Sequence, residues 1–193
     1  MEINRDTFSS FYTAQFGALN EAQESGLDAL LTAIEQDQDV SDIRWVAYML
    51  ATVKHECANT WQPIEEYGKG KGRPYGNPVS VADADGHQYS NVYYGRGYVQ
   101  LTWKDIYQKM SKALGMDDEL YIHPEHALEP DTAYRIMSYG MRNGSFTGKK
   151  LGNYINDAGC DYENARRIIN GTDQADKISS YAQAFEGILN GAI

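Results

Sequence analysis

The spacing of apolar side chains along the first third of the chain predicts three amphipathic helices. The first runs from about Asn4 to Phe16, with aromatic residues at steps of three and four, and the second from about Glu21 to Glu35. The third starts after Ser41, a good N-cap, and its buried stripe continues to His55 and Glu56. Each helix has one apolar face, so we expect all three to pack on a common core.

The middle of the chain breaks this helical pattern. Glycine and proline recur through residues 68–91, which predicts long loops with at most short strands. Helices are predicted again over four segments, at about Trp103–Leu114, Pro130–Met141, Tyr162–Ile169 and after Thr172. We therefore expect one mainly α-helical domain over residues 1–193, with a loop-rich lobe at about residues 60–100.

Composition narrows the range of partners. The chain has 193 residues, enough to bury a substantial core, and its formal net charge of −10 argues against nucleic acid and against stable association with a membrane. Its 15 tyrosines against 5 phenylalanines mildly favour a carbohydrate ligand, although tyrosine also serves ordinary packing. Positive charge gathers at Lys69, Lys71 and Arg73. This cluster is either a solvated loop or a basic lip that meets carboxylates on a substrate.

The cysteines and the N-terminus bear on the compartment. Cys57 and Cys160 are too few for a disulfide framework and fit two lone thiols in a reducing compartment, with a bridge between them as the alternative. The segment Met1–Asp6 lacks the basic and then apolar plan of a secretory signal, and no apolar run has the length of a membrane span. We expect synthesis in the cytoplasm and a separate route to any substrate outside it.

Three glutamates are the first candidates for acid–base chemistry. Glu56 lies at the edge of a buried stripe, where apolar neighbours would raise the pKa of its carboxyl, as a general acid requires; a surface glutamate at a helix end is the alternative. Glu65 and Glu66 follow Pro63 on an extended segment, so only one of them should face a cleft. Inverting glycosidases place two carboxylates across a groove, whereas two solvated loop glutamates are the plainer interpretation.

No metal or organic cofactor is expected. The pair His55-Glu56 lacks a second histidine at helical spacing, so the zinc-protease pattern is absent. His123 and His126 could be metal ligands, but the proline between them favours a helix entry. Asp83–Gly86 begins like a calcium loop, and the residues that follow do not complete it.

The segment Tyr93–Trp103, rich in aromatic residues and glycine, is the most informative in the chain. Together with His55-Glu56, Pro63–Glu66 and Ile169–Thr172, it resembles the family 19 glycoside hydrolases, from about residue 40 to the C-terminus. That family includes plant-type chitinases and related phage endolysins. The resemblance implies a glycosidase with a lysozyme-like, two-lobed helical fold, a loop-rich insertion and a substrate cleft.

The resemblance also implies catalytic roles. Glu56 matches the general acid that protonates the leaving glycosidic oxygen. Glu66 matches the general base that activates water, with Glu65 as the fallback for that role. Thr102 matches the hydroxyl residue that helps to hold the water.

Four more residues are implied in the substrate site. Gln100 matches a cleft residue that contacts the sugar, and Asn170 matches an asparagine that hydrogen-bonds an N-acetyl group. Tyr94 and Arg96 are also assigned to substrate binding, with Arg96 and its flanking glycines shaping the floor of the cleft.

The sequence departs from plant-type chitinases in several places. Cys57–Thr60 differs from the residues that follow the acid there, and Tyr98-Val99 replaces a Pro-Ile pair. Asp105 and Ile106 stand where chitinases have a sugar-contacting tyrosine and asparagine. These departures speak against tight chitin binding by the same contacts. The compact length, the missing secretion signal and the lone thiols resemble the phage or prophage endolysin branch.

We therefore expect a monomeric inverting hydrolase that cleaves the β-1,4 glycan strands of bacterial peptidoglycan. It would have no separate wall-binding domain and would reach the wall after release from the host cytoplasm through a holin-type route. An endochitinase acting on N-acetylglucosamine polymers is the first alternative. A non-catalytic wall-binding or phage structural protein is the second.

Overall fold

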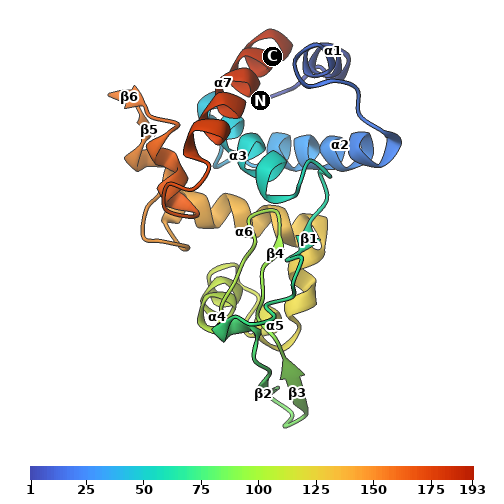
Figure 1. Ribbon diagram of the computed structural model, residues 1–193, viewed down its shortest axis with the longest axis vertical. Helices are drawn as coiled ribbons and strands as arrows, with labels where there is room; N and C mark the ends of the chain where they lie inside the picture. The colour runs from blue at the N-terminus through green and yellow to red at the C-terminus, as the bar shows by residue number, and fades with distance from the viewer.

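The apolar stripes in the sequence fold into the helices that they predict, and the chain is mainly α-helical (Figure 1). The structure is a computed structural model that describes residues 1–193. Its α-helices are α1 (Arg5–Phe16), α2 (Glu21–Gln36), α3 (Ile43–Glu56), α4 (Lys104–Ala113), α5 (Glu119–Ile122), α6 (Pro130–Asn143) and α7 (Ala175–Ala192). Short 3-10 helices are η1 (Pro74–Gly76), η2 (Pro124–Leu128), η3 (Leu151–Asn153) and η4 (Asn164–Ile168).

Side-chain caps explain where the first helices begin. The Asn4 side chain accepts a hydrogen bond from the backbone N–H of Thr7 at the start of α1, and Asn20 forms a capping box with Gln23 at the start of α2. Helix α3 is capped by Asp42 rather than by Ser41, so that prediction was wrong by one residue. The Asp42 carboxylate accepts from the backbone N–H of Arg44, which a hydroxyl one position earlier does not reach.

The strands are short and pair two by two, and Arg96 also bridges to Leu101. Each of the three sheets is antiparallel and two-stranded: β1 (Ile64–Glu65) with β4 (Arg96–Gly97), β2 (Val79–Ala82) with β3 (Gln88–Asn91), and β5 (Ile155–Asn156) with β6 (Gly159–Cys160). The first pairing matters most for the site, because it sets Glu65 opposite Arg96 and Ile64 opposite Gly97. It thereby joins the glutamate segment to the Tyr93–Trp103 segment.

Two lobes follow from this arrangement (Figure 1). Helices α1, α2, α3 and α7 gather in one lobe, where α3 is buried from Val46 to Lys54 and packs against α7. The β2–β3 hairpin, α4 and α5 lie at the other end of the molecule, and α6 crosses between the two ends. The two-lobed helical architecture is confirmed.

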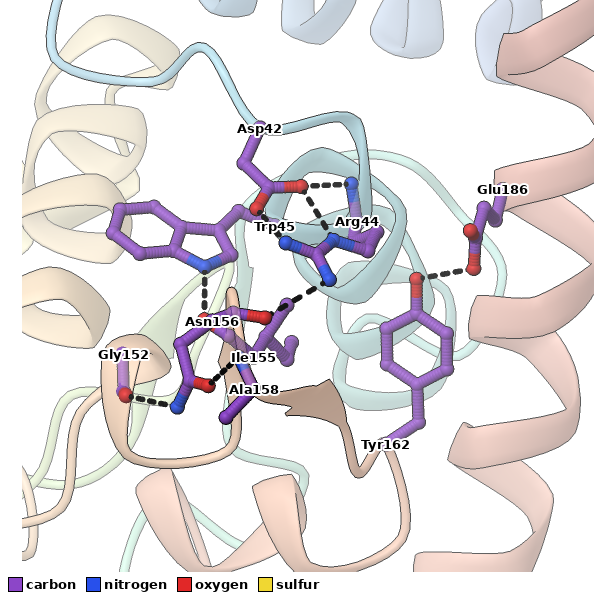
Figure 2. A network of polar contacts seen from close by, with 9 residues as sticks. All are labelled: Asp42, Arg44, Trp45, Gly152, Ile155, Asn156, Ala158, Tyr162 and Glu186. Atoms are coloured by element: carbon purple, nitrogen blue, oxygen red, sulfur yellow. Dashed lines mark hydrogen bonds and ion pairs between the residues drawn. The ribbon is translucent and has the colours of Figure 1, made fainter.

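Helix α3, which ends at Glu56, is anchored at its opposite end by the β5–β6 hairpin (Figure 2). The indole N–H of Trp45 donates to the carbonyl of Ile155 at 2.9 Å, and Arg44 donates to the carbonyl of Asn156 at 3.1 Å. These bonds hold the start of α3 in place, so Glu56 lies at the end of a helix whose other end is fixed. The hairpin was not predicted, because each of its strands has only two residues.

The remaining sequence predictions concern short helices, the two cysteines and membrane spans. The short helix predicted at Tyr162–Ile169 is the 3-10 helix η4, and the α5 turn was not predicted. Cys57 is buried and Cys160 is exposed, and the two are free thiols. No helix has both the length and the apolar character that crossing a membrane requires.

Candidate active site

A cavity of about 350 Å³ lies where the end of α3 meets the Tyr93–Trp103 segment. Four of the predicted site residues line it, namely Glu56, Gln100, Thr102 and Asn170. The other lining residues are Tyr75, Val99, Leu101, Trp103, Ile106, Phe146 and Ile169. Segments far apart in the sequence thus contribute carboxylate, amide, hydroxyl and aromatic groups to one space, as a polar ligand with apolar faces requires.

Glu56 is the last residue of α3 and forms a short ion pair at the cavity. Its Oε1 accepts from Nη1 of Arg166 at 2.6 Å, and the side chains of Glu56 and Arg166 are 15% and 2% exposed. The Nε of Arg166 donates to the carbonyl of Asp173 at 2.7 Å. The arginine is therefore fixed by backbone on one side and holds the carboxylate on the other.

Arg166 was missed by the sequence analysis. It lies in η4, 110 residues after Glu56, and its only sequence signal is a charged residue beside the apolar Ala165 and Ile168. Arg167 fits the same pattern and is exposed, so the sequence neither singles out the buried arginine nor names its partner.

Glu66 contacts the wall of the cavity through Tyr75. The Tyr75 hydroxyl donates to Oε1 of Glu66 at 3.0 Å, and the backbone N–H of Gly95 donates to Oε2 at 3.0 Å. Burial, followed by the hydrogen bond to Glu66, raises the pKa of Tyr75. Glu66 itself does not line the cavity, but its carboxylate is hydrogen-bonded to Tyr75, which does.

Glu65 points to different partners. Its Oε1 accepts from the Tyr94 hydroxyl at 2.6 Å, and its Oε2 lies 2.9 Å from Nζ of Lys69. The hydrogen bond from Tyr94, and then that from Lys69, lower the pKa of Glu65. Neither partner lines the cavity. The two consecutive glutamates therefore face apart, as expected for an extended segment.

Gln100 and Thr102 are held in fixed orientations by the backbone around them. Gln100 adopts a left-handed φ of 56°, and its Nε2 donates to the carbonyls of Ile64 at 2.9 Å and Gly97 at 3.2 Å. A Cβ at Gly95 would lie 2.9 Å from the Gln100 Oε1, so a larger residue there would displace the Gln100 amide. The Thr102 hydroxyl donates to the Gln100 carbonyl at 2.7 Å, which leaves its oxygen lone pairs to accept from a ligand or water.

Tyr94 and Arg96 do not line the cavity, and their assignment to substrate binding stays a prediction. Arg96 is buried, and its guanidinium lies 3.7 Å from the centre of the Tyr94 ring. It donates to the carbonyl of Val92 at 2.9 Å and to the Tyr107 hydroxyl at 3.1 Å. Both residues brace the Tyr93–Trp103 segment from behind, which agrees with the floor-shaping role expected of Arg96.

Aromatic side chains form part of the cavity wall. Trp103 is 50% exposed, and its ring meets that of Tyr75 edge-on at a centroid distance of 5.1 Å. Phe146, which follows α6, lines the same cavity and packs over Gly140 of that helix. None of these three was assigned to the site from the sequence, because aromatic residues at such positions serve core packing equally well.

The two motifs that resemble metal sites take part in local structure. Asp83, Asp85 and His87 could offer ligand atoms within 4.8 Å of one another, but Asp83 already accepts from the backbone N–H groups of Asp85 and His87 and from the Tyr89 hydroxyl. The cluster closes the β2–β3 turn. The segment with His123 and His126 enters the 3-10 helix η2, as expected.

No protein-family model and no curated protein matches the sequence. Chitinase C from Streptomyces griseus HUT6037 matches with a TM-score of 0.65 and 22% identity, over 95% of this chain and 76% of that one. A bacterial family 19 chitinase matches with a TM-score of 0.64 and 22% identity, over 97% and 94% of the two chains.

A plant enzyme gives a weaker match. The class IV family 19 chitinase from Zea mays has a TM-score of 0.51 and 16% identity, over 93% of this chain and 90% of that one. Matches at these identities establish architecture, and they agree with the helical lobes described above. The resemblance seen in the sequence motifs is confirmed at this level: the chain has the fold of the family 19 chitinases.

Proposed function

We propose that this protein is an inverting glycoside hydrolase that cleaves the β-1,4 glycan strands of bacterial peptidoglycan. The observation that carries the proposal is the cavity lined by Glu56, Gln100, Thr102 and Asn170, with Glu66 bonded to the cavity residue Tyr75. A carboxyl group in the cavity, a second one bonded to its wall, a water-holding hydroxyl and an amide suit hydrolysis of an N-acetylated sugar polymer.

Each residue has a defined step in this proposal. The carboxyl of Glu56 gives its proton to the glycosidic oxygen as the bond from that oxygen to the anomeric carbon breaks. Glu66 takes a proton from a water whose oxygen forms the new bond on the opposite face of the sugar. The lone pairs of Thr102 accept a hydrogen bond from that water, and Asn170 binds the N-acetyl group. Solvent then restores both carboxyl groups.

Arg166 supports the acid in this mechanism. After Glu56 has donated its proton, the Arg166 guanidinium pairs with the carboxylate that remains, at the separation of 2.6 Å found in the structure. Arg166 is held by the Asp173 carbonyl, so it needs no rearrangement to do this.

The choice of peptidoglycan rests on charge. The segment from Glu66 to Gly76 turns back on itself, and its ends meet where Tyr75 donates to Glu66. Lys69 on this segment is paired with Glu65, whereas Lys71 and Arg73 are exposed and make no ion pair. Peptidoglycan carries lactyl and stem-peptide carboxylates that two free cations beside the cleft would attract, and chitin carries none. Monomeric action, and delivery by a separate holin-type route, belong to the same proposal.

Chitin is the second candidate substrate, and one specific observation favours it. The three solved structures named above, which share this fold, are chitinases. Purified sacculi and chitooligosaccharides, offered at equal reducing-sugar equivalents, separate the two. Mass spectrometry of reduced muropeptides would detect new reducing ends from sacculi if the proposal is right. Release from chitooligosaccharides alone would assign the enzyme to chitin, and release from neither would remove the hydrolase proposal.

A further inference from the structure

Lys54 is a buried cation in the last turn of α3, two residues before Glu56. It is 8% exposed and makes no ion pair with a carboxylate. Aromatic rings surround its Nζ instead, with ring centres 4.4 Å away in Phe16, 5.4 Å in Tyr12, 5.4 Å in Tyr181 and 5.9 Å in Trp61. Burying an unpaired ammonium opposes folding, so a side chain of this kind calls for a functional role.

The Lys54 ammonium is hydrogen-bonded to the turn that follows α3. Its Nζ donates to Oδ1 of Asn59 and, at 3.2 Å, to the Tyr12 hydroxyl. The backbone carbonyl of Lys54 also accepts from the N–H of Asn59 at 2.9 Å, so one residue binds Asn59 twice. A positive charge at a helix C-terminus further offsets the partial negative charge of the helix end.

This turn has an unusual backbone. Ala58, Asn59 and Trp61 have left-handed φ values of 48°, 63° and 60°. Non-glycine residues keep such angles only where their surroundings hold them there. Here the holding groups are Lys54 on the side chain of Asn59 and Gln23, whose Nε2 donates to the Asn59 carbonyl at 2.8 Å.

The turn connects the two proposed catalytic carboxylates. It begins after Glu56, and the chain enters β1 at Ile64 and reaches Glu66 just beyond it. Any added backbone motion between residues 57 and 62 therefore changes the position of Glu56 relative to Glu66. Small displacements of this kind lower the rate of a positioned reaction steeply.

We infer that Lys54 is a positioning residue of the proposed hydrolase, whose caged ammonium locks the turn at residues 57–61 and so fixes Glu56 relative to Glu66. The inference rests on the proposed function for its effect on catalysis. Its structural part, the locking of the turn, stands on the contacts alone.

The surroundings of Lys54 give the lock a dependence on pH. Burial, and then the charge of Lys177, lower the pKa of Lys54 to about 8. The titratable and charged groups around it are Tyr12 of α1, Tyr181 and Lys177 of α7, and His55 and Glu56 of its own helix. Burial lowers the pKa of His55, so that ring is neutral where Lys54 titrates. Above about pH 8 the lysine loses its charge and its grip on Asn59 weakens.

The test is a Lys54→Met variant compared with Lys177→Met. Lys177 also lies over the Tyr181 ring, at 5.8 Å, but it is exposed and does not touch Asn59. We expect Lys54→Met to lower kcat roughly tenfold or more with KM changed less than about twofold. Wild-type kcat should fall above about pH 8, and the variant should lack this alkaline limb. Lys177→Met should keep kcat and should still show the alkaline limb, moved to a higher pH, because the charge of Lys177 lowers the pKa of Lys54.

Amide hydrogen exchange gives a second measurement that needs no activity. Exchange at residues 57–62 should be faster in Lys54→Met than in wild type or Lys177→Met. If Lys54→Met does not fold, Asn59→Gly removes the same contact while glycine accepts the φ of 63°, and the same changes are expected.

Unchanged kcat, or unchanged exchange at the turn, overturns the inference. If the wild type hydrolyses no glycan at all, the proposed function fails, and faster exchange in the variant still supports the locking of the turn.

Discussion

Arg166 meets Glu56 across 110 residues of sequence, with the guanidinium Nη1 2.6 Å from the carboxylate Oε1. The arginine is almost fully buried, and the glutamate lines the cavity. The pair links η4, which precedes the asparagine of the site, to the end of α3. Through this contact, the two sides of the cavity are held at a fixed separation.

Removing the arginine should therefore damage both folding and catalysis. Arg166→Met leaves the Glu56 carboxylate without its partner, and breaking a buried pair in this way costs about 3–5 kcal/mol of unfolding free energy. Denaturant titration measures this loss. A second Glu56→Gln substitution should recover part of the stability, because it removes the orphaned charge. Equal losses in the single and double variants would contradict the pairing as the source of the effect.

The structure makes unequal predictions for the two adjacent glutamates. Glu66→Gln should lower kcat by roughly a hundredfold or more, since a general base contributes about that much and the amide cannot take the proton. Glu65→Gln should cost less than about tenfold, because that carboxylate is bonded to Tyr94 and Lys69 rather than to a residue of the cavity. Steady-state rates on one soluble glycan decide between them. A larger loss in Glu65→Gln would transfer the role of base to that residue.

The free cations beside the cleft should select the substrate. A Lys71→Gln and Arg73→Gln double variant should hydrolyse sacculi several-fold more slowly, with a weaker dependence on salt, while its rate on neutral chitooligosaccharides stays within about twofold. Lys149→Gln with Lys150→Gln is the matched control, because both lysines are exposed and neither lines the cavity. Equal losses on both substrates in the first variant would remove charge as the basis for choosing peptidoglycan.

Local periodicity predicted the helices well for a physical reason. The stripes of α1, α2 and α3 are local, and the caps at Asn4 and Asp42 lie within three residues of the groups that they bind. The β5–β6 hairpin carries no such signal, because two residues per strand show no alternation. It is held by its contacts with α3, which arise only in the folded chain (Figure 2).

Sequence signals also identified only part of the site, because some of its residues act through contacts formed in the folded chain. Glu56, Gln100, Thr102 and Asn170 were identified through motifs, and all four line one cavity. Arg166 and Lys54 were not identified, because their significance lies in partners that the sequence does not name. Arg96 was assigned to the substrate from its motif, but its burial against Tyr94 and Tyr107 is a property of the packing alone.

The proposed function depends above all on Glu56 donating the proton that breaks the glycosidic bond. The direct test is the release of new reducing ends from purified sacculi by the wild type and by Glu56→Gln, with circular dichroism to show that both are folded. We predict release by the wild type and a loss of at least about a hundredfold in the variant, since an amide has no such proton to give. Release by Glu56→Gln at the rate of the wild type would contradict this role for Glu56.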